Sequence, residues 1–173
     1  MAKLRKMMGE LDDPAIIELM ALMQTQSKET LSQWAYEYVK ENYLPLYVEI
    51  TNDDTLTDLM AVCAQYLAKE IKISEVKLAI KEARAIAQKC QIPVAQAFAR
   101  AISTAMATIT TPTNALGFCF YGACGMAYYQ AGLEEDKDTY NQLASQELVH
   151  ILERLKKVAI SNEAHPVNIK WNC

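Results

Sequence analysis

The chain has 173 residues, of which 51% are apolar and 22% charged, and its formal net charge is -4. This composition is typical of a globular protein with one sizeable core, and the length falls within the roughly 100–200 residues of one domain. The negative charge argues against nucleic acid as the main partner, because phosphate binding requires a basic face. We therefore predict a single domain over residues 1–173.

The first residues, "MAKLRKMMGELDDP", include basic side chains but neither an apolar run nor a small-residue cleavage site, so they do not resemble a secretion signal. We interpret Lys3, Arg5 and Lys6 as part of a solvated terminus. The five cysteines are odd in number and form no C-x-x-C pair. Most lie in apolar stretches, which favours reduced thiols and a cytoplasmic protein.

Helical periodicity begins after Asp13-Pro14, which supplies an N-cap and a proline at the first helical position. Ser27 can cap a second helix, and Pro45 breaks or kinks it. The residues after Pro45 could form a short extended piece, but we expect them to continue as helix. Residues 52–54 (Asn-Asp-Asp) then supply the start of a third helix.

The second half of the chain continues this pattern. Ser74 can cap a fourth helix, Pro93 starts a fifth, and Pro112 starts a sixth with Thr111 as its N-cap. A seventh helix is amphipathic between residues 140 and 155, and from about residue 160 the tail is irregular. The solvated outer face of the fourth helix consists of Lys77, Lys81, Glu82, Arg84, Gln88 and Lys89.

The fifth and sixth helices ("PVAQAFARAISTAMATIT" and "TPTNALGFCFYGACGMAYY") consist largely of small residues, which let two helices approach closely. The apolar run from Ala115 to Tyr129 is shorter than the roughly 20 residues of a membrane span. Gly117, Gly122 and Gly125 each cost about 1 kcal/mol relative to alanine in a helix, and close packing or a ligand must offset this. We favour packing.

The predicted fold class is therefore all-α. We expect about seven helices in antiparallel hairpins, which form one compact bundle around an Ala/Gly-rich central helix pair.

Arg100 is the only charged residue of the fifth predicted helix. A buried arginine is almost always paired, so we predict an internal strut to Glu147 or Glu163, with a binding role as the alternative. At the start of the sixth helix, Thr111, Thr113 and Asn114 lie beside N–H groups that could bind an anion, although an ordinary capped start explains the same residues.

The sequence contains no set of residues that indicates catalysis. Glu147-x-x-His150 has the spacing of half a di-iron site, but no second copy is present, and the helical phase places His150 on the wet face. No nucleophile or phosphate-binding motif occurs. We predict no enzyme activity, no metal and no cofactor. The many Tyr and Trp side chains could serve either a partner surface or the core.

The segment "AQAFARAISTAMATITTPTNALGFCFYGACGMAYY" resembles the core of the bacterial immunity-five-like family of immunity proteins, which is associated with polymorphic toxin systems. The family pattern is an alanine-rich helix with an Ala-Arg pair, a turn, and a small-residue helix with a tyrosine. Here these are Ala99-Arg100, residues 110–117 and Tyr121. The match is specific over about 35 residues and continues more weakly upstream and toward Trp171. Many relatives have histidine where this chain has Asn114.

The resemblance implies a small α-helical protein that binds a cognate toxin and neutralises it by stoichiometric occlusion. An alternative hypothesis is a small-molecule-binding protein or enzyme with a pocket near the start of the sixth helix. A third is a homo-oligomer that buries surface tyrosines between subunits. The candidate binding residues are Arg100, Thr111, Thr113, Asn114 and Tyr121.

Overall fold

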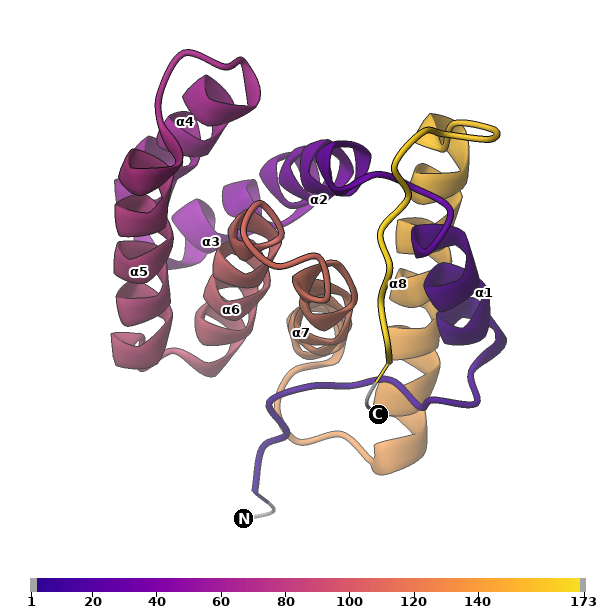
Figure 1. Ribbon diagram of the computed structural model, residues 1–173. Helices are drawn as coiled ribbons and strands as arrows, with labels where there is room; N and C mark the ends of the chain where they lie inside the picture. Colours follow the sequence, from indigo (N-terminus) through magenta and orange to yellow (C-terminus); the bar gives the residue numbers. More distant parts are fainter. Residues whose placement is uncertain (1–2, 172–173) are drawn as a thin grey trace.

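In the computed structural model, which describes residues 3–171, the chain forms eight α-helices and no strand within that range (Figure 1). The bounds are α1 Pro14–Met23, α2 Lys28–Asn42, α3 Leu44–Thr51, α4 Thr55–Leu67, α5 Ile73–Lys89, α6 Pro93–Ala107, α7 Asn114–Ala131 and α8 Lys137–Val158. The predicted all-α bundle is confirmed.

The structure has one helix more than predicted, because the chain is divided into two helices near Pro45. Proline lacks an N–H and cannot continue the hydrogen-bond ladder of α2, so α2 ends at Asn42 and α3 begins at Leu44. Tyr43 joins them, with its own N–H donating to the carbonyl of Val39 at 3.0 Å. The residues after the proline are helical, as expected.

Several predicted helix starts are confirmed. The N–H of Ala15 donates to Oδ1 of Asp13 at 2.8 Å, and the N–H of Thr30 donates to Oγ of Ser27 at 3.1 Å. Pro93 is the first residue of α6. These caps satisfy donors that a helix start leaves free.

Two predicted starts are wrong. The helix assigned to a Ser74 cap begins at Ile73, after Lys72, whose N–H donates to the Glu75 carboxylate at 3.0 Å. The helix assigned to a Thr111 cap begins at Asn114, because residues 108–113 form successive tight turns instead.

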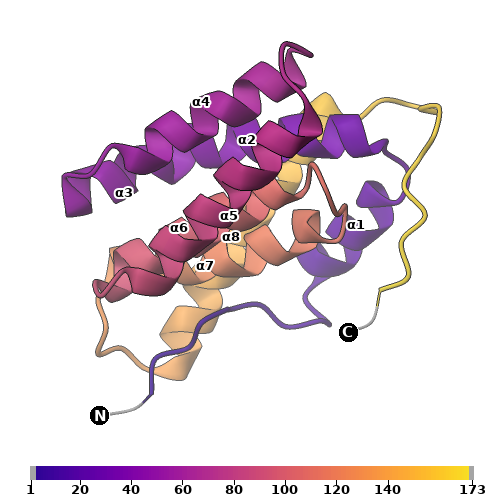
Figure 2. The same cartoon turned by 60° about the vertical axis from the view of Figure 1, so that its left-hand side comes forward.

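The helices are arranged in two layers. α5, α6, α7 and α8 lie side by side, and α1 packs on the outside of α8 (Figure 1). The segment α2–α3–α4 lies along one side of this row, as the turned view shows (Figure 2). The contacts of α6 and α7 with each other are more extensive than those of any other helix pair. The predicted central pair is thus confirmed.

Glycines on α7 allow large aromatic side chains to approach its backbone. A Cβ at Gly125 would lie 2.7 Å from ring atoms of Phe98, and one at Gly122 would lie 2.5 Å from ring atoms of Tyr43. Both distances are shorter than any van der Waals contact. Close packing is therefore what offsets the low helix propensity of these two glycines.

The segments at both ends of residues 3–171 pack against the bundle. Met8 is buried and its N–H donates to the carbonyl of Phe120 at 3.1 Å, while the N–H of Arg5 donates to the Tyr128 hydroxyl at 2.8 Å. The prediction of a solvated terminus is therefore wrong for Arg5, which is half-buried.

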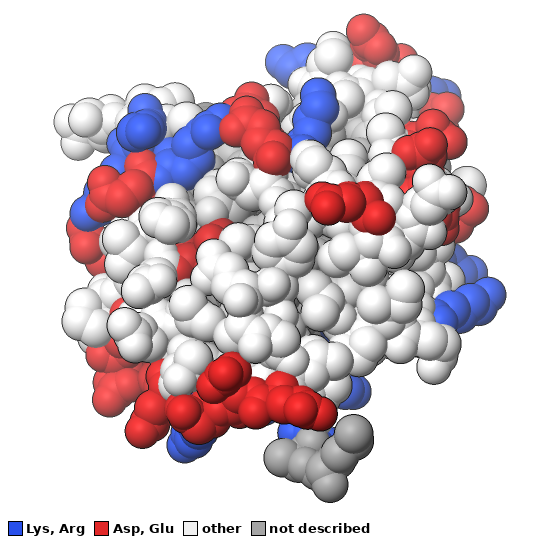
Figure 3. Space-filling view, turned by 180° about the vertical axis from the view of Figure 1, so that it is seen from behind, with Lys and Arg blue, Asp and Glu red and all other residues white. Residues whose placement is uncertain are grey.

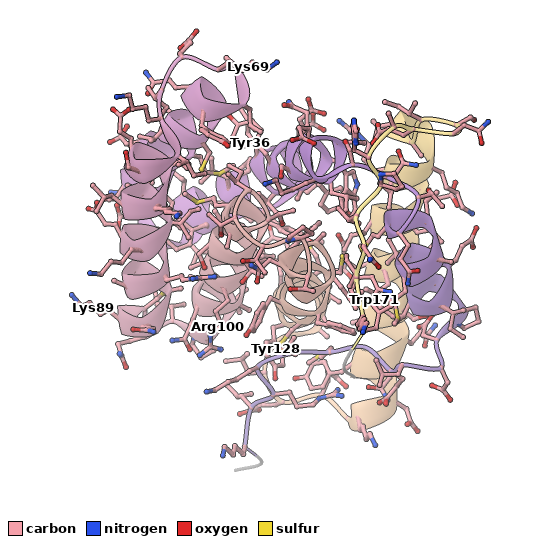
Figure 4. All side chains as sticks on the ribbon, viewed as in Figure 1. Tyr36, Lys69, Lys89, Arg100, Tyr128 and Trp171 are labelled. Atoms are coloured by element: carbon pink, nitrogen blue, oxygen red, sulfur yellow. The ribbon has the colours of Figure 1, made fainter. Side chains whose placement is uncertain are left out.

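The described part of the tail after α8 is irregular, and it is held at the start of α2. The carboxylate of Glu163 accepts hydrogen bonds from the N–H of Ser27 and the hydroxyl of Thr30. Trp171, at the end of the described tail, packs half-buried against the core (Figure 4). None of the helices within residues 3–171 combines the length and hydropathy needed to cross a bilayer.

Candidate functional site

Arg100 has no acidic partner among the described residues, so the predicted strut to Glu147 or Glu163 is wrong. The side chain is half-buried on α6. It faces the side of the bundle where the N-terminal segment passes, as does Tyr128 (Figure 4). An unpaired arginine in this position is available to a ligand from outside the chain.

The backbone N–H groups in the first turn of α7 are already paired. The N–H groups of residues 114–117 donate to carbonyls of residues 111–113 at 3.0–3.4 Å, and the side-chain amide of Asn114 donates to the carbonyl of Ala107 at 3.2 Å. Thr111 and Thr113 are exposed. The N–H groups of residues 114–117 are therefore not available to the predicted anion, and the Asn114 amide is hydrogen-bonded to the last residue of α6.

Arg100 and Tyr121, by contrast, line the same hollow. Three adjoining hollows of about 550, 270 and 150 Å³ run between α5, the central helices and the N-terminal segment. Arg84 and Gln88 line both the first and the second, while Lys6 and Arg100 line both the second and the third. The second hollow therefore adjoins both the first and the third along this side of the bundle.

We call this feature the basic groove and define it by five of the cationic side chains that line it, Lys6, Lys77, Lys81, Arg84 and Arg100. No carboxylate of the described residues lines it, and none of the five forms an ion pair within residues 3–171. Four of the five side chains are exposed and Arg100 is half-buried. The groove thus concentrates unneutralised positive charge on a chain whose net charge is -4.

Arg5 also borders the groove, but its guanidinium points elsewhere. Its Nη1 donates to Oδ1 of Asn141 on α8 at 2.9 Å, and its guanidinium carbon lies 6.0 Å from the centre of the Tyr140 ring. The Arg5 guanidinium therefore contacts α8, and Arg5 is left out of the side chains that define the groove.

Other surfaces differ from the groove. A hollow of about 710 Å³ between α2, the end of α4 and the tail has both Glu29 and Glu37 in its wall. The face seen from behind is largely uncharged in the middle, and Asp and Glu residues gather along its lower margin (Figure 3). The basic groove is thus the hollow with the most one-sided charge that we find in the described part of the chain.

A second cluster of titratable groups lies between α2 and α8. The hydroxyls of Tyr38 and Tyr43 donate to Oε1 of Glu147 at 2.5 and 2.9 Å. Desolvation by burial raises the pKa of Glu147, although the two hydroxyl donors act in the opposite direction. Burial likewise raises the pKa of both tyrosines. These two hydrogen bonds pair the buried hydroxyls with the carboxylate and connect α8 to the junction of α2 and α3.

His150 lies at the mouth of this cluster. Its Nδ1 is 3.6 Å from Oε2 of Glu147, beyond hydrogen-bond distance, and its side chain is 72% exposed. The prediction that His150 lies on the wet face is confirmed. The described residues contain no group of three or more His, Cys, Asp or Glu side chains that could hold a metal ion.

Most of the aromatic residues considered for a partner surface belong to the core. Tyr129 is 43% exposed. The buried ones are Trp34, Tyr36, Tyr38, Tyr43, Tyr47 and Tyr128.

Sequence reasoning identified Arg100 and Tyr121 but not the rest of the groove. The available signal was the spacing of Lys77, Lys81 and Arg84, which places all three on one face of α5. The Tyr38–Tyr43–Glu147 cluster left no comparable signal, because more than 100 residues separate the tyrosines from the glutamate.

Comparison with known proteins agrees with the resemblance in the central helices. The family model described as "Imm-5 like putative immunity protein" matches residues 21–153, and the chain therefore belongs to that family. No curated protein and no solved structure matches the chain. The matched range includes α2 to α7 and most of α8, but neither the N-terminal segment nor the tail with Trp171.

Proposed function

We propose that this protein binds a cognate bacterial toxin and neutralises it by stoichiometric occlusion. Membership of the immunity-protein family over residues 21–153 carries the proposal. Occlusion requires a stable surface of defined shape, and a bundle with a closely packed central pair can supply one. It requires no catalytic group, so we propose that the protein is not an enzyme.

We further propose that it acts in the cytoplasm. Cys63, Cys90, Cys119 and Cys124 are all free thiols in the structure, as expected in a reducing compartment.

Among the candidate binding residues, we propose Arg100 and Tyr121 as toxin contacts, because they line one accessible hollow. Thr111 and Thr113 are exposed and stay in the proposal as neighbouring contacts, whereas the Asn114 amide already has a partner. These five residues do not line one shared cavity among those found. The geometry therefore favours a protein partner over the alternative of a small-molecule pocket at the start of α7.

Co-expression tests the proposal. Each candidate toxin encoded beside this protein in its source genome is expressed alone and then together with it, and growth is measured. We expect one toxin to arrest growth alone and to be neutralised by co-expression. The purified pair should elute as one complex of fixed stoichiometry in size-exclusion chromatography with light scattering, which also reports whether the chain alone is a homo-oligomer.

The matched comparison is an Arg100→Ala, Tyr121→Ala double variant, checked for folding by circular dichroism. Loss of neutralisation by the folded variant supports these two contacts. If no adjacent toxin is bound or neutralised by the wild-type chain, the proposal is wrong.

A further inference from the structure

We infer that the basic groove binds a short acidic segment of the partner protein, in an extended conformation. The inference rests on the proposed function for the identity of the partner, but its chemistry follows from the groove itself. Six cationic side chains line the groove, namely the five that define it and Arg5, and no carboxylate of the described residues does.

The cations are free to bind a ligand. All five ion pairs in residues 3–171 lie on α1, α2 and α8, and none involves a groove residue. A surface that keeps several unneutralised cations together repels itself, and that repulsion is relieved when an anionic partner binds.

The groove also has neutral hydrogen-bonding groups on its inner wall, which suit carboxylates better than a bare cluster of charges would. These groups are the side chains of Gln88, Ser103, Thr104 and Tyr121. Arg100 presents a planar guanidinium that can bind one carboxylate through two parallel hydrogen bonds.

The size of the groove limits the length of the ligand. Lys77, Lys81, Arg84 and Gln88 follow one face of α5 over eleven residue steps, or about 16 Å at 1.5 Å per residue. An extended peptide covers this distance with about five residues at 3.3 Å each. A segment of that length with several Asp or Glu residues would meet most of the cations.

The charge of the whole chain favours a protein segment over nucleic acid. The net charge is -4 even with the groove cations included, so the surface outside the groove is more negative still. A nucleic acid longer than the groove would place phosphates over that surface, where they are repelled. An acidic segment that belongs to a folded partner can end where the groove ends.

Fluorescence anisotropy with two labelled probes tests the inference. One probe is an eight-residue glutamate-rich peptide and the other is an eight-nucleotide oligothymidylate. The wild-type chain should bind the peptide more tightly than the oligonucleotide, with an affinity that falls as salt rises. In the groove variant, Lys77→Glu, Lys81→Glu, Arg84→Glu, the peptide dissociation constant should rise about tenfold or more, since three exposed ion pairs are lost and replaced by repulsion.

A matched control reverses three exposed lysines outside the groove, Lys40, Lys137 and Lys170, and lowers the net charge by the same amount. Its peptide affinity should stay within about twofold of the wild type, because such exposed charges contribute little at a distance. If the groove variant does not fold, as judged by circular dichroism, the neutral variant Lys77→Gln, Lys81→Gln, Arg84→Gln replaces it. Equal weakening in the control, tighter binding of the oligonucleotide, or no peptide binding would each overturn the inference.

Neutralisation assays separate this inference from the proposed function. If the wild-type chain neutralises a toxin and the folded groove variant does so equally well, immunity stands and the groove is not the contact. If the wild-type chain neutralises none of the adjacent toxins, the proposed function fails, while the peptide measurement still decides what the groove binds.

Discussion

Replacing Gly122 with alanine should destabilise the protein, although alanine is the better helix former. The added Cβ would lie 2.5 Å from the Cε2 and Cζ atoms of Tyr43. This ring cannot easily move away, because it is fully buried and stacks on Phe98 with ring centres 5.4 Å apart. Its hydroxyl also donates to Glu147 at 2.9 Å. Any shift of the ring therefore disturbs both contacts.

The magnitude follows from three opposing effects. Alanine gains about 1 kcal/mol over glycine in a helix. Overpacking of a well-filled core costs about 1–3 kcal/mol. Losing the Tyr43 donor to a buried carboxylate costs about 1.5–3 kcal/mol more. We expect Gly122→Ala to lower the free energy of unfolding by about 2–4 kcal/mol, within the range of core substitutions that introduce strain.

Urea denaturation followed by circular dichroism measures this change. Gly117→Ala in the same helix is the matched control, because its Cβ would meet only the Thr104 methyl group, at 3.2 Å. That methyl belongs to a half-buried side chain and can give way, so the control should stay within about 1 kcal/mol of the wild type. If Gly122→Ala is as stable as Gly117→Ala, the argument that Tyr43 requires a glycine beneath it is wrong.

Three further predictions concern ionisable groups. Burial raises the pKa of Glu147 above its ordinary value of 4.5, so the folded state holds this proton more tightly than the unfolded state. The free energy of unfolding of the wild type should therefore fall as the pH rises from below 4.5 through the folded-state pKa of Glu147. Urea titrations at several pH values should show this fall in the wild type and not in Glu147→Gln. The same pH dependence in both proteins would contradict the reasoning. Burial raises the pKa of Cys63 to about 12 and that of Cys124 to about 11. Among the four cysteines of residues 3–171, a thiol reagent should therefore modify the half-buried Cys90 first in the native protein, as peptide mass spectrometry would reveal. Faster labelling of Cys63 than of Cys90 would refute this. Arg100→Ala should change the free energy of unfolding by no more than about 1 kcal/mol, because no ion pair is lost. A larger decrease, measured by urea denaturation, would show that Arg100 stabilises the fold.

Local patterns in the sequence were sufficient to predict the fold class, because each depends on residues close together in the chain. The caps at Asp13 and Ser27 and the proline at the start of α6 are local features, and they lie where they were predicted. The small-residue composition of α6 and α7 correctly indicated the central pair. Predicted starts failed at Ser74 and Thr111. At the first, the N–H of Lys72 donates to the Glu75 carboxylate and the helix begins earlier; at the second, tight turns through residues 108–113 delay the helix.

The candidate site depended on tertiary structure to a much greater extent. Helical spacing could place Lys77, Lys81 and Arg84 on one face of α5, but only the packing of α5 beside α6 brings them to Arg100 and Lys6. Partner choice was likewise beyond the sequence, since Glu147 was proposed for Arg100 and instead accepts from two tyrosines more than 100 residues away. The sequence alone therefore determined the all-α class and the small-residue central pair, since both follow from local periodicity and composition. Which charges meet, and which stay unpaired at the surface, was decided by the three-dimensional packing of helices that lie far apart in the chain.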